Sequence, residues 1–175
     1  MELSIKSTTL LIAILLTGLS AGLFYAWEVS VIPGTKRIPD RSYLETMQSI
    51  NRAILNPAFY IIFFGSLLFL IGSSYLQYKA QFNLAFLLVL AATLSYVIGT
   101  FGVTLFGNVP LNEGLDVVNL NQLSKEALTD TRLTYEGQWN RWHTIRTVFS
   151  VLAFLLCLLA AFMESSSDKI SSLNL

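Results

Sequence analysis

The sequence predicts an all-α integral membrane protein: an up-down-up-down bundle of four transmembrane helices, with a short amphipathic helix between helices 1 and 2 and another in the helix 3–4 connection. Of the 175 residues, 54% are hydrophobic and 13% are charged, against roughly 25% charged in an ordinary soluble domain. A bilayer core of about 30 Å requires roughly 20 consecutive apolar helical residues. Four uncharged segments qualify or nearly qualify: residues 7–27, 53–78, 80–112 and 147–163.

We expect one membrane domain over residues 1–175, with transmembrane helices at about 7–32, 56–78, 83–107 and 138–164. The first apolar segment exceeds the h-region of a secretory signal, which is about 7–15 residues long, so it is kept as a helix. Its Gly18-Leu19-Ser20-Ala21-Gly22 pattern allows close helix approach. This pattern favours either packing within the chain or a homo-oligomer.

An amphipathic interfacial helix is predicted at about 40–54, after the stop signal Ile32-Pro33-Gly34. Asp40 or Ser42, together with Glu45, supplies N-terminal capping chemistry. Four apolar residues recur there at helical spacing; they are Tyr43, Met47, Ile50 and Ile54.

The two remaining connections differ in length and charge. A short polar link near residues 77–81 makes helices 2 and 3 an antiparallel hairpin. The long connection over 107–141 contains a predicted surface helix at 123–133. Most Lys and Arg residues lie in the two long connections, so the positive-inside rule places these in the cytoplasm, on one side of a bacterial cytoplasmic membrane.

The fourth uncharged segment is too short to cross a bilayer. Its 17 residues extend only about 25 Å as a helix. The fourth helix must therefore begin before Arg146, which brings Arg146 and His143 to the membrane boundary or below it.

Polar and aromatic residues gather where the helices meet at one membrane side, whereas the other side is nearly featureless. The last helix contributes four at i, i+3, i+4 and i+7, which share one face. Buried ionisable groups in a membrane are functional candidates by default, and Glu28 is the expected counter-charge for Arg146 or for protonated His143. The candidate site residues are Tyr25, Glu28, Asn51, Asn56, Asn108, Asn112, Trp139, Trp142, His143 and Arg146.

Each of these residues also has a structural interpretation. Trp and Tyr at helix ends are ordinary interfacial anchors. The Arg146 side chain could extend to lipid headgroups, and Glu28 could lie in water beyond the helix end. His143 could be a hydrogen-bonded packing residue.

Composition excludes several function classes. A formal net charge of zero leaves no basic stripe for nucleic acid. One cysteine, Cys157, and one histidine, His143, exclude a disulfide framework within the chain and a multi-histidine metal site. We expect no bound metal.

Over about residues 8–163 the chain resembles the anthrone oxygenase-like family of small four-helix membrane proteins, many of them bacterial and without assigned function. The resemblance rests on Asn108-Val109-Pro110-Leu111-Asn112 and on Trp139-Asn140-Arg141-Trp142-His143-Thr144-Ile145-Arg146. It also includes the runs from Ile32 to Arg41, Met47 to Arg52 and Asn56 to Phe59. The resemblance implies oxidation of an aromatic substrate by molecular oxygen without a dedicated cofactor, because fungal members oxidise anthrones to anthraquinones.

The chemistry that the resemblance implies fits the candidate residues. His143 or Glu28 would be the base that removes an acidic C–H proton. Arg146, Asn108 and Asn112 would stabilise the resulting enolate oxygen. Trp139 and Trp142 would hold the flat ring between them.

Other function classes remain open. The same pocket could bind a quinone, a lipid or a haem without catalysis, with His143 as the single axial ligand of the haem. A transporter or channel is disfavoured, since the midplane segments carry no ionisable residues. A structural subunit is the remaining alternative. The expected partners are the lipid bilayer and a small hydrophobic aromatic molecule.

Overall fold

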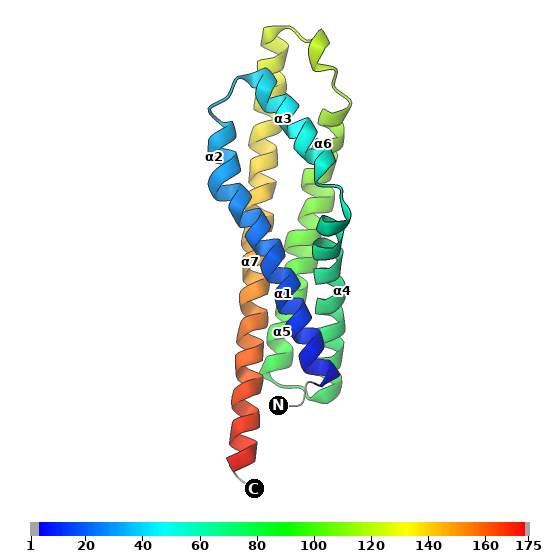
Figure 1. Ribbon diagram of the computed structural model, residues 1–175, viewed down its shortest axis with the longest axis vertical. Coiled ribbons are helices and arrows are strands. Elements are labelled where there is room, and N and C mark those ends of the chain that lie inside the picture. Colours follow the sequence, from blue (N-terminus) through cyan, green and yellow to red (C-terminus); the bar gives the residue numbers. More distant parts are fainter. Residues whose placement is uncertain (1–3, 174–175) are drawn as a thin grey trace.

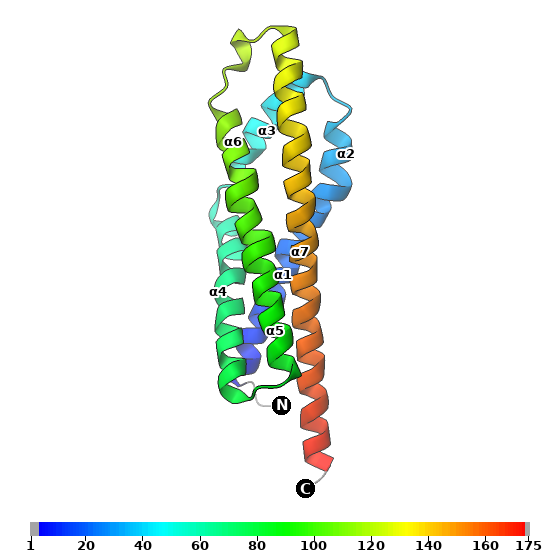
Figure 2. The same ribbon diagram turned by 180° about the vertical axis from the view of Figure 1, so that it is seen from behind.

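Four long helices run side by side in the computed structural model, which describes residues 4–173 and the side chains of residues 4–164 (Figures 1 and 2). Four helical segments are long and apolar enough to cross a membrane: Ile5–Thr35, Pro57–Ala80, Leu84–Asp116 and Lys125–Glu164. The predicted helical membrane bundle is confirmed, and the chain is an integral membrane protein.

The first span is a single helix with three consecutive parts: α1 (Ile5–Ala26), the π-helical η1 (Trp27–Val31) and α2 (Ile32–Thr35). Pro33 lies in the first turn of α2, so it does not end the helix where the sequence suggested. Within α1, a Cβ atom added at Gly18 would lie 3.0 Å from the Phe154 ring, whereas Gly22 has no atom within 4 Å. Gly18 therefore packs within the chain.

The amphipathic helix α3 (Asp40–Ala53) follows a short turn. Its N-cap is Pro39, which makes no side-chain capping bond, so the predicted capping by Asp40 or Ser42 is wrong. The Asp40 carboxylate instead accepts hydrogen bonds from the last helix, at 2.6 Å from the Thr129 hydroxyl and 3.1 Å from Arg132 Nη1.

Two helices form the predicted hairpin between the second and third spans. α4 (Pro57–Ala80) is capped by Asn56, whose side-chain oxygen accepts from the Phe59 N–H at 3.1 Å. α5 (Leu84–Leu94) is capped in the same way by Asn83, which accepts from the Phe86 N–H.

The third span continues beyond the predicted end near residue 107. α5 is followed by the π-helical segments η2 (Ser95–Gly102) and η3 (Thr104–Asn108), and then by α6 (Val109–Asp116). Pro110 does not break the helix, because it occupies the first turn of α6.

The last helix, α7 (Lys125–Leu173), is longer than expected. The segment predicted as a separate surface helix at 123–133 is the first part of α7, and only the short 3-10 helix η4 (Leu120–Gln122) lies in the connection. No proline interrupts residues 125–164, so nothing in the backbone forces a break.

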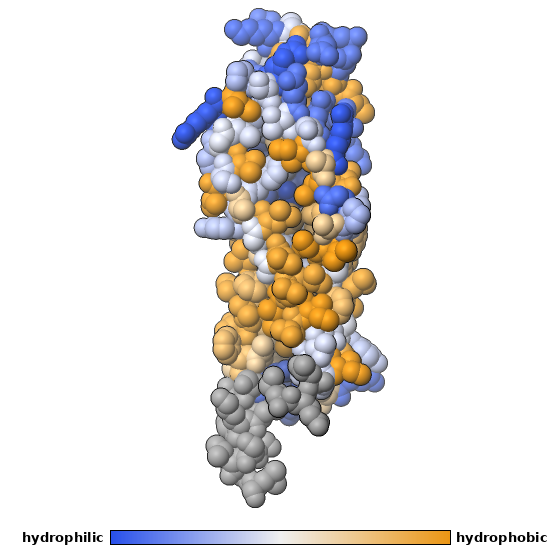
Figure 3. Space-filling view, in the orientation of Figure 1, coloured by the Kyte–Doolittle hydropathy of each residue, from blue (hydrophilic) through white to orange (hydrophobic). Residues whose placement is uncertain are grey.

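The buried apolar residues form two clusters. One lies between the spans and includes small residues that let helices approach closely; its smallest members are Ala13, Ala92, Ala153 and Ala160. The other lies beneath α3 and includes Tyr43, Leu44 and Met47. We call the part of the molecule that surrounds this second cluster the head; it is made of α2, α3, α6, η4 and the first turns of α7. Figure 3 shows a hydrophobic band below the head, whose own surface is largely hydrophilic with scattered hydrophobic groups.

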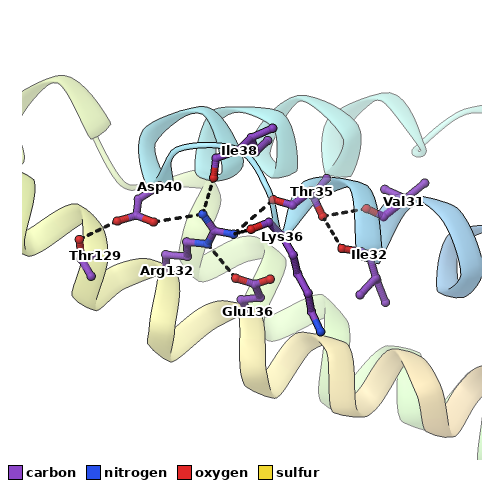
Figure 4. Close-up of polar contacts among 9 residues, drawn as sticks. All are labelled: Val31, Ile32, Thr35, Lys36, Ile38, Asp40, Thr129, Arg132 and Glu136. Atoms are coloured by element: carbon purple, nitrogen blue, oxygen red, sulfur yellow. Dashed lines mark hydrogen bonds and ion pairs between the residues drawn. The ribbon is translucent and has the colours of Figure 1, made fainter.

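Arg132 of α7 binds the turn between α2 and α3 through hydrogen bonds and ion pairs (Figure 4). Arg132 donates hydrogen bonds to the carbonyl oxygens of Ile38 and Thr35, at 2.7 and 3.2 Å. It also contacts the carboxylates of Asp40 at 3.1 Å and Glu136 at 2.7 Å. This buried, fully paired guanidinium fixes the position of α3 over the bundle.

Two side chains of α3 near this contact have shifted pKa values. The hydrogen bond from Thr129 is the main reason why the pKa of Asp40 is below its usual value, and Arg132 lowers that pKa further. Burial raises the pKa of Tyr43, whose ring lies 4.5 Å from the Arg132 guanidinium carbon.

The opposite end of the bundle is less featureless than the sequence indicated. Gln77 is buried and donates a hydrogen bond to the Glu164 carboxylate. Lys6 pairs with the same carboxylate at 2.9 Å. These contacts join α1, α4 and α7 at that end.

Candidate functional site

His143 lies fully buried at the centre of the site, with both ring nitrogens engaged. Nε2 lies 3.1 Å from the Phe24 carbonyl oxygen, which can only accept, so Nε2 carries a proton. Nδ1 accepts from Arg146 Nε and Nη2 at 3.1 and 2.8 Å. The imidazole is therefore the neutral Nε2–H tautomer, and its only lone pair points at a guanidinium.

Arg146 is 8% exposed and has no carboxylate partner within the described part of the chain. Its guanidinium carbon lies 4.6 Å from the Phe24 ring centroid and 5.2 Å from that of Trp139. A cation in an apolar setting normally has a counter-charge, because its desolvation is costly. Arg146 is thus the opposite of Arg132, which has two carboxylate partners.

Glu28 faces His143 rather than Arg146. It lies in the π-helical η1, a type of segment that is frequent at functional sites. Its Oε2 is 3.7 Å from His143 Nε2. The Thr144 hydroxyl, on α7, lies 3.0 and 3.2 Å from the two carboxylate oxygens and so orients the group.

A second hydrogen-bond network joins three helices beside the histidine. Asn51, from α3, donates to the Tyr135 hydroxyl at 3.0 Å, and that hydroxyl donates to Asn112 Oδ1 at 3.1 Å. Trp139 Nε1 donates to the same oxygen at 2.7 Å. Because Oδ1 of Asn112 accepts both hydrogen bonds, the orientation of its amide is fixed, and its NH₂ group takes no part in this network.

These groups meet at a cavity of about 110 Å³. Its lining comes from all four spans and α3: Leu23, Phe24, Trp27, Ile50, Asn51, Ile54, Leu55, Phe59, Thr104, Val109, Asn112, Trp139, His143 and Arg146. The cavity is partly open to the surface, and Leu55 is the most exposed of its lining residues, at 61%. Figure 3 shows a recess at the level where the hydrophobic band meets the hydrophilic head.

The cavity brings together half of the candidate residues from the sequence: Asn51, Asn112, Trp139, His143 and Arg146. Glu28 lies behind His143, outside the lining. Asn108 is also outside; it is fully buried and donates to the Trp139 carbonyl oxygen at 3.2 Å.

Three other candidates do not line the cavity. Tyr25 is 57% exposed on the outer face of α1. Asn56 serves as the N-cap of α4. Trp142 lies against Gly107, outside the cavity lining, so it cannot hold a ring together with Trp139. His143 itself stacks on Trp139, with ring centroids 5.0 Å apart and planes 9° apart.

Sequence reasoning missed Tyr135, which orients Asn112. A signal was available, because positions 135, 139, 143 and 146 follow one helical stripe at spacings of four and three. The apolar lining residues, such as Leu23 and Ile54, carry no comparable signal, since lipid-facing and cavity-facing leucines look alike in sequence.

The fold and the site together define a four-span helical membrane protein with a polar and aromatic cavity at one end. The sequence profile of the anthrone oxygenase family matches residues 57–156. The chain belongs to this family. The match includes Asn112, Trp139, His143 and Arg146 but begins after Glu28 and Asn51. Comparisons with curated proteins and with solved structures found no match.

Proposed function

We propose that this protein oxidises a hydrophobic aromatic or quinol-type substrate with molecular oxygen inside the membrane boundary. The observation that carries the proposal is the Arg146 guanidinium, which is buried at the cavity with no carboxylate partner among the side chains of residues 4–164. Such a cation suits an oxyanion that forms during reaction, because electrostatic stabilisation is strong where water is excluded. Membership of the anthrone oxygenase family agrees with this chemistry.

In the proposed reaction, the substrate carries a C–H₂ group beside a ring-conjugated ketone. Loss of one C–H proton leaves an enolate whose oxygen is stabilised by Arg146 and by the Asn112 NH₂ group. The base is His143. Its Nδ1 lone pair is released when the ketone oxygen of the bound substrate takes over the hydrogen bonds of Arg146, and Glu28 beside Nε2 stabilises the imidazolium.

Molecular oxygen then completes the oxidation. The enolate carbon gives electrons to O₂ and forms a C–O bond, and the terminal peroxide oxygen takes a proton. Loss of the second C–H proton breaks the O–O bond, so that a ketone forms and the hydroxide released leaves as water. The carbon loses four electrons and O₂ gains four: one oxygen atom enters the product and the other becomes water.

Oxygen uptake with an anthrone, measured on the protein in lipid nanodiscs, tests this proposal. We expect Arg146→Ala to lower the rate about 10²- to 10³-fold, as for loss of an oxyanion donor. We expect His143→Ala to lower it about 10²- to 10⁴-fold, as for loss of a general base. Arg141→Ala, an exposed arginine on the same helix, is the matched control. Unchanged rates in both site variants would refute these roles.

Non-catalytic binding of a quinone, lipid or haem in the same cavity is the alternative function. No bound haem is part of the proposal: an axial bond from His143 would use the Nδ1 lone pair, which accepts from Arg146 and which the proposed reaction uses as the base. An absorption spectrum of the protein purified from its own membrane separates the two. A haem band that disappears in His143→Ala would replace the proposed oxidation with haem binding.

The proposal also includes an orientation. Arg37, Arg41, Arg52 and Arg132 lie in the head or beside it, which by the positive-inside rule places the head and the cavity on the cytoplasmic side of a bacterial inner membrane. Labelling of a cysteine introduced at Arg37, an exposed residue before α3, in intact cells and in inverted vesicles tests this. Labelling in intact cells alone would reverse the orientation.

A further inference from the structure

The cavity has a polar inner end and an apolar mouth. The polar groups at the inner end are the least accessible: His143 is 0% exposed, Arg146 8% and Asn51 9%. The accessible lining residues are leucines, with Leu23 36% and Leu55 61% exposed. A ligand therefore meets apolar side chains first and hydrogen-bond donors last.

The enclosed space is small for an aromatic substrate of several rings. Its volume of about 110 Å³ is below that of the roughly 150 Å³ apolar cavity that binds benzene in an engineered protein. One ring at most fits beside Arg146 without rearrangement. The remainder of a larger ligand has to pass out through the mouth.

The mouth is bordered by Leu23 of α1 and by Leu55 of the α3–α4 junction. Leu23 is 18 residues beyond Ile5, the first residue of α1, which is about 27 Å along the helix and close to the thickness of the hydrocarbon core. Leu55 lies in the junction between α3 and α4, where Asn56 caps α4 and holds the Ala53 carbonyl oxygen at 2.8 Å. This junction fixes the outer wall of the mouth.

From these features we propose that the ligand is an aromatic ring bearing a hydrocarbon chain. The ring sits at Arg146 and Asn112, and the chain leaves between α1 and the α3–α4 junction into the bilayer. This inference rests on the proposed function, because it assigns the ring to the same cavity. It adds a substrate class: a membrane-resident phenol, quinol or enolisable ketone with a hydrocarbon tail.

Binding of two matched probes tests the chain contact: a methyl-substituted and a decyl-substituted hydroquinone, titrated into protein in nanodiscs. The chain raises the apparent affinity partly by partitioning into lipid, and that part is the same for every variant. The informative quantity is therefore the dissociation constant of the methyl probe divided by that of the decyl probe. We expect the double variant Leu23→Ala/Leu55→Ala to reduce this ratio by about fivefold to tenfold, through lost apolar contact.

The matched control is Leu105→Ala, a leucine on η3 that is 46% exposed and absent from the cavity lining. It should keep the ratio of the wild-type protein. A decyl chain carrying a diazirine should label the peptides that contain Leu23 and Leu55 on illumination.

The outcomes separate this inference from the function on which it rests. An unchanged ratio in Leu23→Ala/Leu55→Ala, with the methyl probe still bound through Arg146, would overturn the chain contact and leave the ring site standing. If the wild-type protein does not bind the methyl probe, this result would instead count against the proposed function. A lowered ratio with wild-type affinity for the methyl probe would support the chain contact.

Discussion

Gly99 lies directly against Phe149: a Cβ atom added at Gly99 would be 2.0 Å from Phe149 Cγ and 2.5 Å from its Cβ. This contact joins η2, in the third span, to α7. Because the Phe149 Cβ is itself in the way, rotation of the ring alone cannot make room. The third and fourth spans can approach this closely only because position 99 has no side chain.

Gly99→Ala should therefore destabilise the bundle by about 1–3 kcal/mol through overpacking. Gly22→Ala is the matched control, since Gly22 is also helical and has nothing within 4 Å of the added atom. Alanine there should be neutral or stabilising by up to about 1 kcal/mol. Thermal unfolding in detergent, followed by circular dichroism, checks both. Equal Tm values for the two variants would contradict the packing argument.

Arg146→Met should separate stability from activity. It removes a buried cation that lacks a carboxylate partner, so we expect the Tm to stay the same or rise, despite the lost hydrogen bond to His143. Oxygen uptake should fall by at least about 10²-fold. Arg132→Met should lower the Tm, because it removes the hydrogen-bond donor of two carboxylates and three carbonyl groups. A large fall in Tm for Arg146→Met would show that the residue is structural.

Tyr135→Phe should weaken both the fold and the orientation of Asn112. The hydroxyl accepts from Asn51 and donates to Asn112, so its loss leaves a buried amide N–H unpaired, at a cost of about 1–3 kcal/mol. Tyr25→Phe removes a hydroxyl from a residue that is 57% exposed and outside the cavity. It should leave Tm and oxygen uptake within error of the wild type. The reverse order of effects would argue that Tyr25 contacts the substrate.

Stability should depend on the charge of Asp40 at low pH. The pKa of Asp40 is lowered in the folded protein, first by the hydrogen bond from Thr129 and then by Arg132. Its contribution is therefore fully present above the unfolded pKa of about 3.9 and is lost as the pH falls through the lower, folded value. In Asp40→Asn the part of the Tm profile below about pH 4 should flatten. Asp130→Asn, at an exposed position on α7, should keep the wild-type profile.

Charge placement was enough to predict the spans and the burial of the site. Arg146 was expected at or below the membrane boundary because the uncharged segment after it is too short, and it is buried. The separate helix at 123–133 was wrong, since a polar surface stretch and the polar start of a longer helix have the same composition. Only the absence of a proline or another break distinguishes them.

The site was predicted less completely, for geometric reasons. Positions 139 and 142 are three apart, which places their side chains about 60° apart around a helix. Gly107 leaves room for the Trp142 indole, which therefore packs against the third span at Gly107 and does not line the cavity. The three π-helical segments also shift the helical phase of the residues that follow, so spacing rules cannot place Glu28 or Thr104.

The unbroken course of α7 has a mechanical consequence. Arg132 and His143 lie on one straight element, eleven residues or about 16 Å apart, with no flexible joint between them. Docking of another molecule on the head would push on the α2–α3 turn. Because α7 is unbroken, this displacement would move His143 through a rotation or tilt of the whole helix. The tilt would change the gap between His143 on α7 and Phe24 on α1, so the hydrogen bond at Nε2 of His143 would respond to contacts that the head makes.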